Sequence, residues 1–230
     1  MAISDRELRR RLLQAVKEIK EKSPKRNFVE SIELQIGIKD VDLNRPENRF
    51  RTNIRLAYPI ATKDKIGFFA DDAHATALKN LETNGEVTII DRAKIEELRS
   101  NPKAAKKIAK KTRIFLASQS LMGLIGRYFG RILSPRNKMP IPVPPNADLK
   151  GVIDDARRTI MLRLHKSPSI NVKIGNVNMN DEEVVENAMT VISAIKDRLP
   201  KGYRNIGSIT IKTTMGPPVK ISLKEMKKRK

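Results

Sequence analysis

Two kinds of hydrophobic pattern alternate along the chain. Near both ends, apolar residues occupy every second position of short segments such as Phe28–Ile38, Arg49–Tyr58 and Ser208–Met215. In the middle, short unbroken apolar runs such as Ile66–Ala70 alternate with helical segments. Period-two alternation is typical of strands with one buried face, whereas continuous apolar strands separated by helices indicate a parallel sheet covered on both faces. The pattern predicts two different sheets.

Two amphipathic helices accompany the alternating strands. The first is predicted to begin at a capping box of Ser4 and Glu7 and to end at Ser23-Pro24. The second begins at a capping box of Asn180 and Glu183. Neither end of the chain supplies enough strands to bury its own helical stripe, so the two ends are expected to fold together.

The chain is therefore predicted to form a discontinuous two-layer α+β domain from residues 1–66 plus 159–230, an antiparallel sheet with two helices. Residues 67–158 are predicted to be an inserted, doubly wound three-layer α/β domain. Five prolines in residues 134–146 exclude a helix or a central strand and indicate an extended surface loop.

Charge directs attention to a polyanionic partner. The 230 residues include 47 Lys and Arg against 26 Asp and Glu, a formal charge of +21. Nucleic acid is favoured over an acidic membrane because no apolar span or amphipathic anchor accompanies the charge, so no membrane partner is expected. A basic surface that serves only solubility is the alternative. The chain has no cysteine, which excludes disulfides and thiolate metal sites and fits a reducing compartment.

Arginines also gather on one predicted strand. Arg49, Arg51 and Arg55 are predicted to share one face of the second strand, where they would repel one another unless an anion lies among them. Together with Lys212 they are predicted to form a secondary basic face that contacts phosphate.

A turn follows the strand Ser208–Met215. The sequence Thr214-Met215-Gly216-Pro217-Pro218 brings a hydroxyl, a thioether and a bare backbone to one strand end. The alternation places Met215 on the same side as Ile209 and Ile211, but at this strand end its thioether is expected to be exposed. Such a turn suits recognition of a sugar-phosphate chain, whose oxygens accept from hydroxyl and backbone N–H groups. An ordinary hairpin turn is the alternative.

Catalytic motifs are not apparent. His74 and His165 lack the neighbours of a zinc site, so no metal is expected. Asp71-Asp72-Ala73-His74 could be an active-site corner at the end of a parallel strand, but a helix cap with His74 on the surface is favoured.

Glycines in the middle segment do not form a nucleotide site. Gly123, Gly126 and Gly130 lack the spacing of a dinucleotide or P-loop motif and are expected to help helices pack closely. No nucleophile and base pair stands out, so no cofactor and no enzymatic activity are predicted.

Three motifs resemble the L-one family of large-ribosomal-subunit stalk proteins in its archaeal form. They are S-I-T-I-K-T-T-M-G-P at Ser208–Pro217, F-V-E-S-I-E-L at Phe28–Leu34 and G-R-I-L-S-P-R-N-K-M-P at Gly130–Pro140. The resemblance implies a discontinuous first domain and an inserted Rossmann-like second domain. It departs from the bacterial pattern at Gly130–Pro140, where the usual glycine-rich loop is missing.

Carried over by position, the resemblance implies a set of RNA-contacting residues: Glu18, Phe28, Ser31, Arg163, Lys166, Ser208, Thr214, Met215 and Gly216. Asn27 stands where the family commonly has lysine, and His165 where it has an acid. The hydroxyls of this set suit ribose 2′-OH and phosphate groups, by which proteins distinguish RNA from DNA.

The resemblance also implies partners. They are the rRNA stalk of the large subunit, the tRNA leaving the exit site and a look-alike operator in the protein's own mRNA, whose binding represses translation. The protein is expected at the cytoplasmic ribosome and as a monomer outside it. An RNA-modifying enzyme with a nucleotide cofactor in the middle domain and a non-specific DNA-compacting protein are the rival interpretations.

Overall fold

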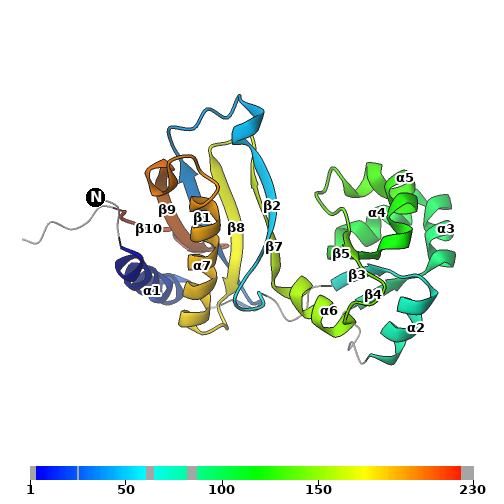
Figure 1. Cartoon of the computed structure of the whole chain (residues 1–230). Coiled ribbons are helices and arrows are strands. Elements are labelled where there is room, and N and C mark those ends of the chain that lie inside the picture. The colour runs from blue at the N-terminus through cyan, green and yellow to red at the C-terminus, as the bar shows by residue number, and fades with distance from the viewer. Residues whose placement is uncertain (1–3, 25, 61–64, 82–86, 224–230) are drawn as a thin grey trace, which may run out of the picture. The chain divides into compact units, whose positions relative to one another are not determined.

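The computed structural model of the chain describes residues 4–24, 26–60, 65–81 and 87–223. It divides into two compact units (Figure 1), which we call the discontinuous unit, Met1–Ala61 with Arg158–Lys230, and the inserted unit, Thr62–Arg157. The predicted boundary at residues 66/67 lies too late, because Lys65 and Ile66 already belong to a strand of the inserted unit and pair with its neighbouring strands.

The discontinuous unit contains the elements α1 (Asp5–Lys22), β1 (Ser31–Ile38), η1 (Pro46–Asn48), β2 (Phe50–Arg55), β7 (Thr159–Leu164), β8 (Ser169–Asn176), α7 (Asp181–Lys196), η3 (Gly202–Asn205), β9 (Ile206–Thr213) and β10 (Val219–Ile221). Four strands form an antiparallel sheet in the order β10-β9-β1-β8, and β2 and β7 form an antiparallel pair. This confirms the predicted α+β class.

One hydrophobic core holds the two ends of the chain together. The buried stripe of α1, which includes Leu8, Leu12 and Val16, packs in the same cluster as Val184 and Ile192 of α7 and the inward side chains of β1, β8 and β9. Because these elements come from both ends of the sequence, neither end has a complete core alone.

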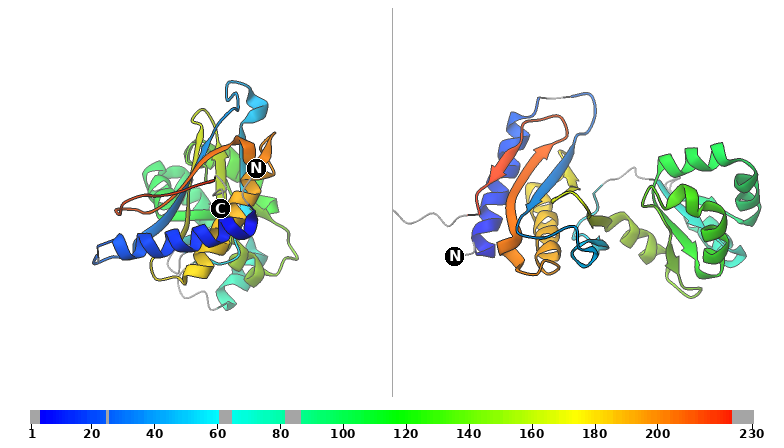
Figure 2. Two further views of the ribbon diagram at one scale, coloured as in Figure 1. Left: turned by 90° about the vertical axis from the view of Figure 1, so that its left-hand side faces the viewer. Right: turned by 90° about the horizontal axis from the view of Figure 1, so that it is seen from above.

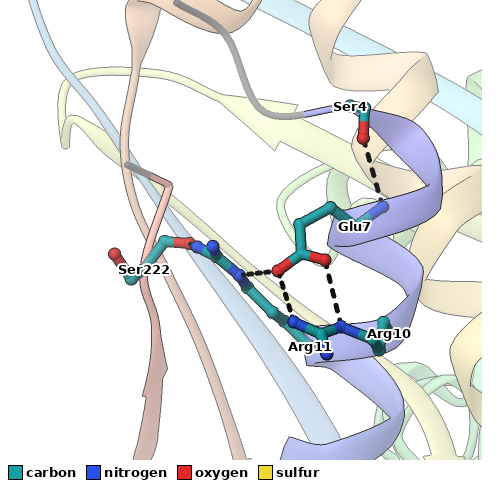
Figure 3. Close-up of polar contacts among 5 residues, drawn as sticks. All are labelled: Ser4, Glu7, Arg10, Arg11 and Ser222. Carbon is teal, nitrogen blue, oxygen red and sulfur yellow. Dashed lines mark hydrogen bonds and ion pairs between the residues drawn. The ribbon is translucent and has the colours of Figure 1, made fainter. Parts of the chain in front are cut away.

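The two predicted capping boxes differ in the structure. Asn180 and Glu183 form both bonds of the box at α7. At α1 the Ser4 hydroxyl accepts from the Glu7 N–H at 3.3 Å, but the Glu7 carboxylate accepts from the guanidinium groups of Arg10 and Arg11 (Figure 3). These two hydrogen bonds lower the pKa of Glu7. Arg11 also donates to the Ser222 carbonyl, which joins α1 to the segment after β10.

A tyrosine joins the same two ends of the chain. The Tyr203 hydroxyl donates to Asp5 Oδ1 at 2.7 Å. Burial, then this hydrogen bond and the charges of Asp5 and Asp197, raises the pKa of Tyr203 well above its usual value.

We expect the raised pKa to make the protein less stable at alkaline pH. Above pH 10 the unfolded state releases the Tyr203 proton while the folded state retains it, so the free energy of unfolding falls as pH rises. Thermal unfolding between pH 8 and 11 should show a shallower decline for Tyr203→Phe than for the native chain. Equal declines would contradict this role.

The inserted unit contains the elements β3 (Lys65–Phe69), α2 (Asp72–Asn80), β4 (Val87–Ile90), α3 (Arg92–Ser100), α4 (Pro102–Lys111), β5 (Thr112–Ser118), η2 (Gln119–Leu121), α5 (Met122–Leu133), β6 (Ile141–Val143) and α6 (Leu149–Arg158). All strand pairs are parallel, in the order β4-β3-β5-β6. One core cluster packs α3, α4 and α5 against the sheet, and a second packs α2 and α6. The predicted three-layer α/β architecture is confirmed.

Several local predictions were wrong. The segment 134–146 has no helix and no central strand, as expected, but it is not loop throughout: it contains β6, whose prolines are tolerated because the strand lies at the sheet edge. The first alternating strand begins at Ser31 and not at Phe28.

Gly123, Gly126 and Gly130 do not serve helix packing. A Cβ placed at any of the three would meet nothing within 4 Å, so no neighbouring helix approaches α5 there. The prediction for His74 was also wrong, since its side chain is buried, with 4% exposed. Asp71 caps α2 as expected, and its carboxylate accepts from the His74 N–H.

Candidate nucleic-acid interface

The four-stranded sheet is covered on one face. α1 runs along β10 and β9 (Figure 2), and α7 packs over β8. On the other face β9 presents Ser208, Thr210 and Lys212, which are partly exposed, and β1 presents Glu33 and Gln35. Antiparallel strands with alternating side chains produce such a polar open face.

Beyond the end of β9 the chain makes a turn that is fixed to the start of β1. The Thr214 N–H donates to the Ser31 carbonyl at 3.0 Å. The Thr214 hydroxyl lies 3.3 Å from that carbonyl and 3.2 Å from Glu33 Oε1. The turn therefore keeps a fixed position, and its exposed side chains project from a rigid backbone.

Gly216 lies in tight contact with two hydroxyl groups. Its N–H donates to Thr213 Oγ1 at 3.0 Å, and this oxygen is 2.6 Å from Ser23 Oγ at the end of α1. A Cβ on Gly216 would lie 2.2 Å from Thr213 Oγ1 and 2.5 Å from Ser23 Oγ. Glycine is required here by this close approach.

Apolar side chains are exposed beside this turn. Met215 is 59% exposed, as expected for a thioether at this strand end, because β9 ends at Thr213 and Met215 belongs to the turn that follows. Phe28 is 58% exposed and lines a groove of about 530 Å³ together with Ser23 and Glu30. Large apolar side chains in solvent suit stacking on a base or a sugar.

Two carboxylates near the end of α1 are held in ion pairs. Glu18 lies on α1 one turn before Lys22, with which it forms an ion pair. Glu30 is 3% exposed and lies 3.5 Å from Arg26 Nε. Each carboxylate thus forms an ion pair with a cation four residues away in the sequence.

The remaining residues of the predicted set lie at the opposite end of the sheet. Ser208 pairs with Gly37, near the end of β1. At a rise of about 3.3 Å per residue, Ser208 lies roughly 20 Å from Thr214 along β9. Lys166 lies in the loop whose Pro168 carbonyl accepts from the Ile38 N–H at that end. The RNA-contacting set implied by the resemblance therefore falls into two groups, one near each end of the open face.

This second group is strongly cationic. Burial, then the positive charges of Arg163, Arg49 and Lys166, lowers the pKa of His165. Three cations thus lie near the His165 ring, and a phosphate placed there would be attracted by all of them.

The predicted secondary basic face is not one surface. The Arg49 guanidinium donates to the carbonyls of Leu43 and Asn44 and holds that loop. Arg51 lies opposite Arg163 in the β2–β7 pair, and Arg55 lies at its far end. Lys212 belongs to the other sheet, with its ammonium 4.0 Å from Glu33.

The inserted unit encloses a histidine cluster that resembles catalytic groups in composition only. His74 Nδ1 is 2.8 Å from both Asp71 Oδ1 and Ser118 Oγ. Both partners meet the same ring nitrogen, and Ser118 is fully buried. A serine nucleophile needs access to substrate and a base that can take its proton, and neither condition is met. No group of three metal-ligating side chains occurs among the described residues.

Comparison with known proteins bears on these surfaces. Residues 17–217 match the model of the Ribosomal protein L1p/L10e family, a span that includes the β1 start, the inserted unit and the turn at Gly216.

The chain belongs to this family.

Relatives within the family match over nearly the whole chain. A protein of Thermococcus kodakarensis, the large ribosomal subunit protein uL1, is 41% identical over 93% of this chain and 97% of its own length. The uL1 protein of Methanocaldococcus jannaschii is 38% identical over 96% of this chain and 99% of its own. The resemblance to the archaeal form of the family is confirmed. No described helix is long and apolar enough to cross a membrane.

Sequence reasoning missed several residues that shape the family's T-M-G-P turn in this chain. Ser23 and Thr213 supply the hydroxyls against Gly216, and Glu33 accepts from Thr214. Thr213 offered a signal, because it is a polar residue on the inward face of a strand. Ser23 offered none, since its contact spans 190 positions of sequence.

Proposed function

We propose that this protein is a large-subunit ribosomal protein that binds the folded rRNA stalk through the discontinuous unit. The supporting observation is the turn Thr213–Gly216, where the exposed Thr214 and Met215 and the bare backbone of Gly216 are held against β1 and α1. We further propose that Glu18, Phe28 and Ser31 contribute at this end, and that Ser208, Arg163 and Lys166 contact the same RNA at the other.

The division of chemistry follows from the side chains. Rigid hydroxyls and backbone N–H groups suit ribose and phosphate oxygens at fixed positions, which selects a particular RNA fold. Cations such as Arg163 and Lys166 add affinity that depends on salt and does not select the site.

We propose two further activities, which the resemblance to the family suggests. Binding of the stalk at the cytoplasmic ribosome would allow the protein to assist release of deacylated tRNA from the exit site. Binding of a similar fold in its own mRNA would repress translation. In each case the role is RNA recognition and not catalysis.

A competition titration at moderate salt tests the proposal. Stalk-type RNA should displace a labelled stalk RNA at far lower concentration than duplex RNA or duplex DNA. Equal competition by the two duplexes would instead indicate a non-specific DNA-compacting protein. Measurable binding of ATP or S-adenosylmethionine would favour an RNA-modifying enzyme.

We expect Thr214→Ala and Met215→Ala each to weaken stalk-RNA binding by about 1–3 kcal/mol, the loss of one good specific contact. Met215→Ala should leave thermal unfolding unchanged because the side chain is mostly in solvent. Thr76→Ala is the matched control, since its hydroxyl also donates to a backbone carbonyl but lies on α2. A melting temperature that falls in parallel with affinity would mean that the turn is structural only.

A further inference from the structure

Positive charge in the inserted unit gathers on one of its two helical layers. α4 carries five lysines and no acid in ten residues: Lys103, Lys106, Lys107, Lys110 and Lys111. All five are exposed. α5 adds Arg127 and Arg131, both exposed, and again has no acid. α4 and α5 pack side by side in the same core cluster. We call these seven side chains the α4–α5 face.

This arrangement works against the stability of the helix that carries it. Lys103 and Lys107, and likewise Lys106 and Lys110, are four residues apart and lie on the same side of α4. Like charges at this spacing cost a helix about 0.2–0.5 kcal/mol for each pair. Within the described part of the chain, no ion pair or hydrogen bond engages any of the five ammonium groups. Folding of the unit therefore gives no reason for the charge.

The opposite layer provides an internal comparison. α2 begins with Asp72, and α6 contains Asp154 and Asp155 beside its basic residues, so acids and bases there are mixed. Both layers of helices pack their apolar side chains against the same sheet. The excess of cations on α4 and α5 is thus specific to one face and not a property of the unit.

The chemistry of the face indicates phosphate and not bases. Among the described residues, the large apolar side chains in solvent all belong to the discontinuous unit. Tyr128 of α5 is only partly exposed, and the Arg99 guanidinium lies 4.6 Å from the centre of its ring. Without a free aromatic platform, stacking on unpaired bases is not available. The exposed glycines of α5 leave room for a backbone to approach Arg127 and Arg131.

We propose that the α4–α5 face binds the phosphate backbone of duplex RNA. It would form a second, sequence-independent attachment in addition to the selective site of the discontinuous unit. The inference rests on the proposed function, because membership of a ribosomal family makes RNA the relevant polyanion. One unit then selects the RNA, and the other adds affinity through release of counterions.

The test uses the full chain with Lys106→Gln and Lys110→Gln combined, and stalk-type RNA extended by a duplex arm. Each phosphate contact contributes about 0.9 to the slope of log K against log salt concentration. The double variant should therefore lower the magnitude of this slope by up to about 1.8. The ratio of the binding constant at 0.1 M salt to that at 1 M salt would then be roughly 60-fold smaller than in the native chain. Its melting temperature should not fall, since the substitutions relieve repulsion within α4.

The matched control is Lys79→Gln with Lys150→Gln, which removes the same charge from α2 and α6. It should retain the native slope, and the preference for stalk-type RNA over duplex RNA should be unchanged in both double variants. Equal slopes for the two double variants would overturn the second attachment while leaving the proposed function intact. If the native chain shows no preference for stalk-type RNA over duplex RNA, the proposed function itself is overturned.

Discussion

Replacing Asn187 by alanine is expected to lower the free energy of unfolding by roughly 3 kcal/mol, because one buried and two partly buried backbone groups lose their partner. Asn187 lies on α7 with no exposed surface. Its side-chain oxygen accepts from the Tyr58 N–H at 2.9 Å, and its amide donates to the carbonyls of Ile174 at 2.9 Å and Tyr58 at 3.2 Å. One side chain thus joins α7, β8 and the segment after β2. Urea unfolding measures the loss.

Two further variants make this prediction specific. Asn53→Ala, on the exposed side of β2, should change stability by no more than about 0.5 kcal/mol. Asn187→Asp keeps the acceptor for Tyr58 but places a carboxylate in a buried site, which raises its folded pKa above the unfolded value near 3.9. This variant should gain stability as pH falls, because only its protonated form can donate to a carbonyl. A pH-independent loss would show that the amide contacts do not determine stability here.

The architecture could be predicted because its signals are local and repeated. Alternation at Ile32, Leu34 and Ile36 specifies one buried strand face, and the stripe of α1 specifies a helix with one buried side. The shortage of strands at each end of the chain then requires the ends to combine. Burial of every one of these positions follows from periodicity alone.

The details that were missed depend on contacts between distant residues. Nothing near Gly216 in the sequence shows that Ser23 lies beside Thr213 Oγ1, because that contact spans 190 positions of the chain. The position of Lys166 at the Ser208 end of the sheet follows from the hydrogen bond between the Ile38 N–H and the Pro168 carbonyl, which the sequence does not reveal. His74 is buried because Ser118, at the end of another strand, lies beside its ring. Each case is a contact between residues far apart in the sequence, which no local pattern of residues reveals.

Alanine at Gly216 is expected to reduce both stability and RNA binding. The added Cβ would lie well inside contact distance of the hydroxyl oxygens of Thr213 and Ser23. Thr213 is fully buried and cannot move into solvent, so the turn must shift instead. Overpacking of this kind costs about 1–3 kcal/mol of folding free energy. The shift also displaces Thr214 and Met215, so stalk-RNA affinity should fall by more than in either single-contact variant.

Gly207 supplies the control for this last prediction. It lies on β9, the strand that leads into the turn, and a Cβ there would meet its nearest neighbours at 3.5 Å, an ordinary contact distance. Gly207→Ala should therefore leave the melting temperature nearly unchanged. Adding Ser23→Ala to Gly216→Ala removes one of the two close contacts and should restore part of the stability, because the nearer contact with Thr213 remains. Full stability in Gly216→Ala alone would mean that the hydroxyls give way freely, and the turn would then not be held rigid for RNA as proposed.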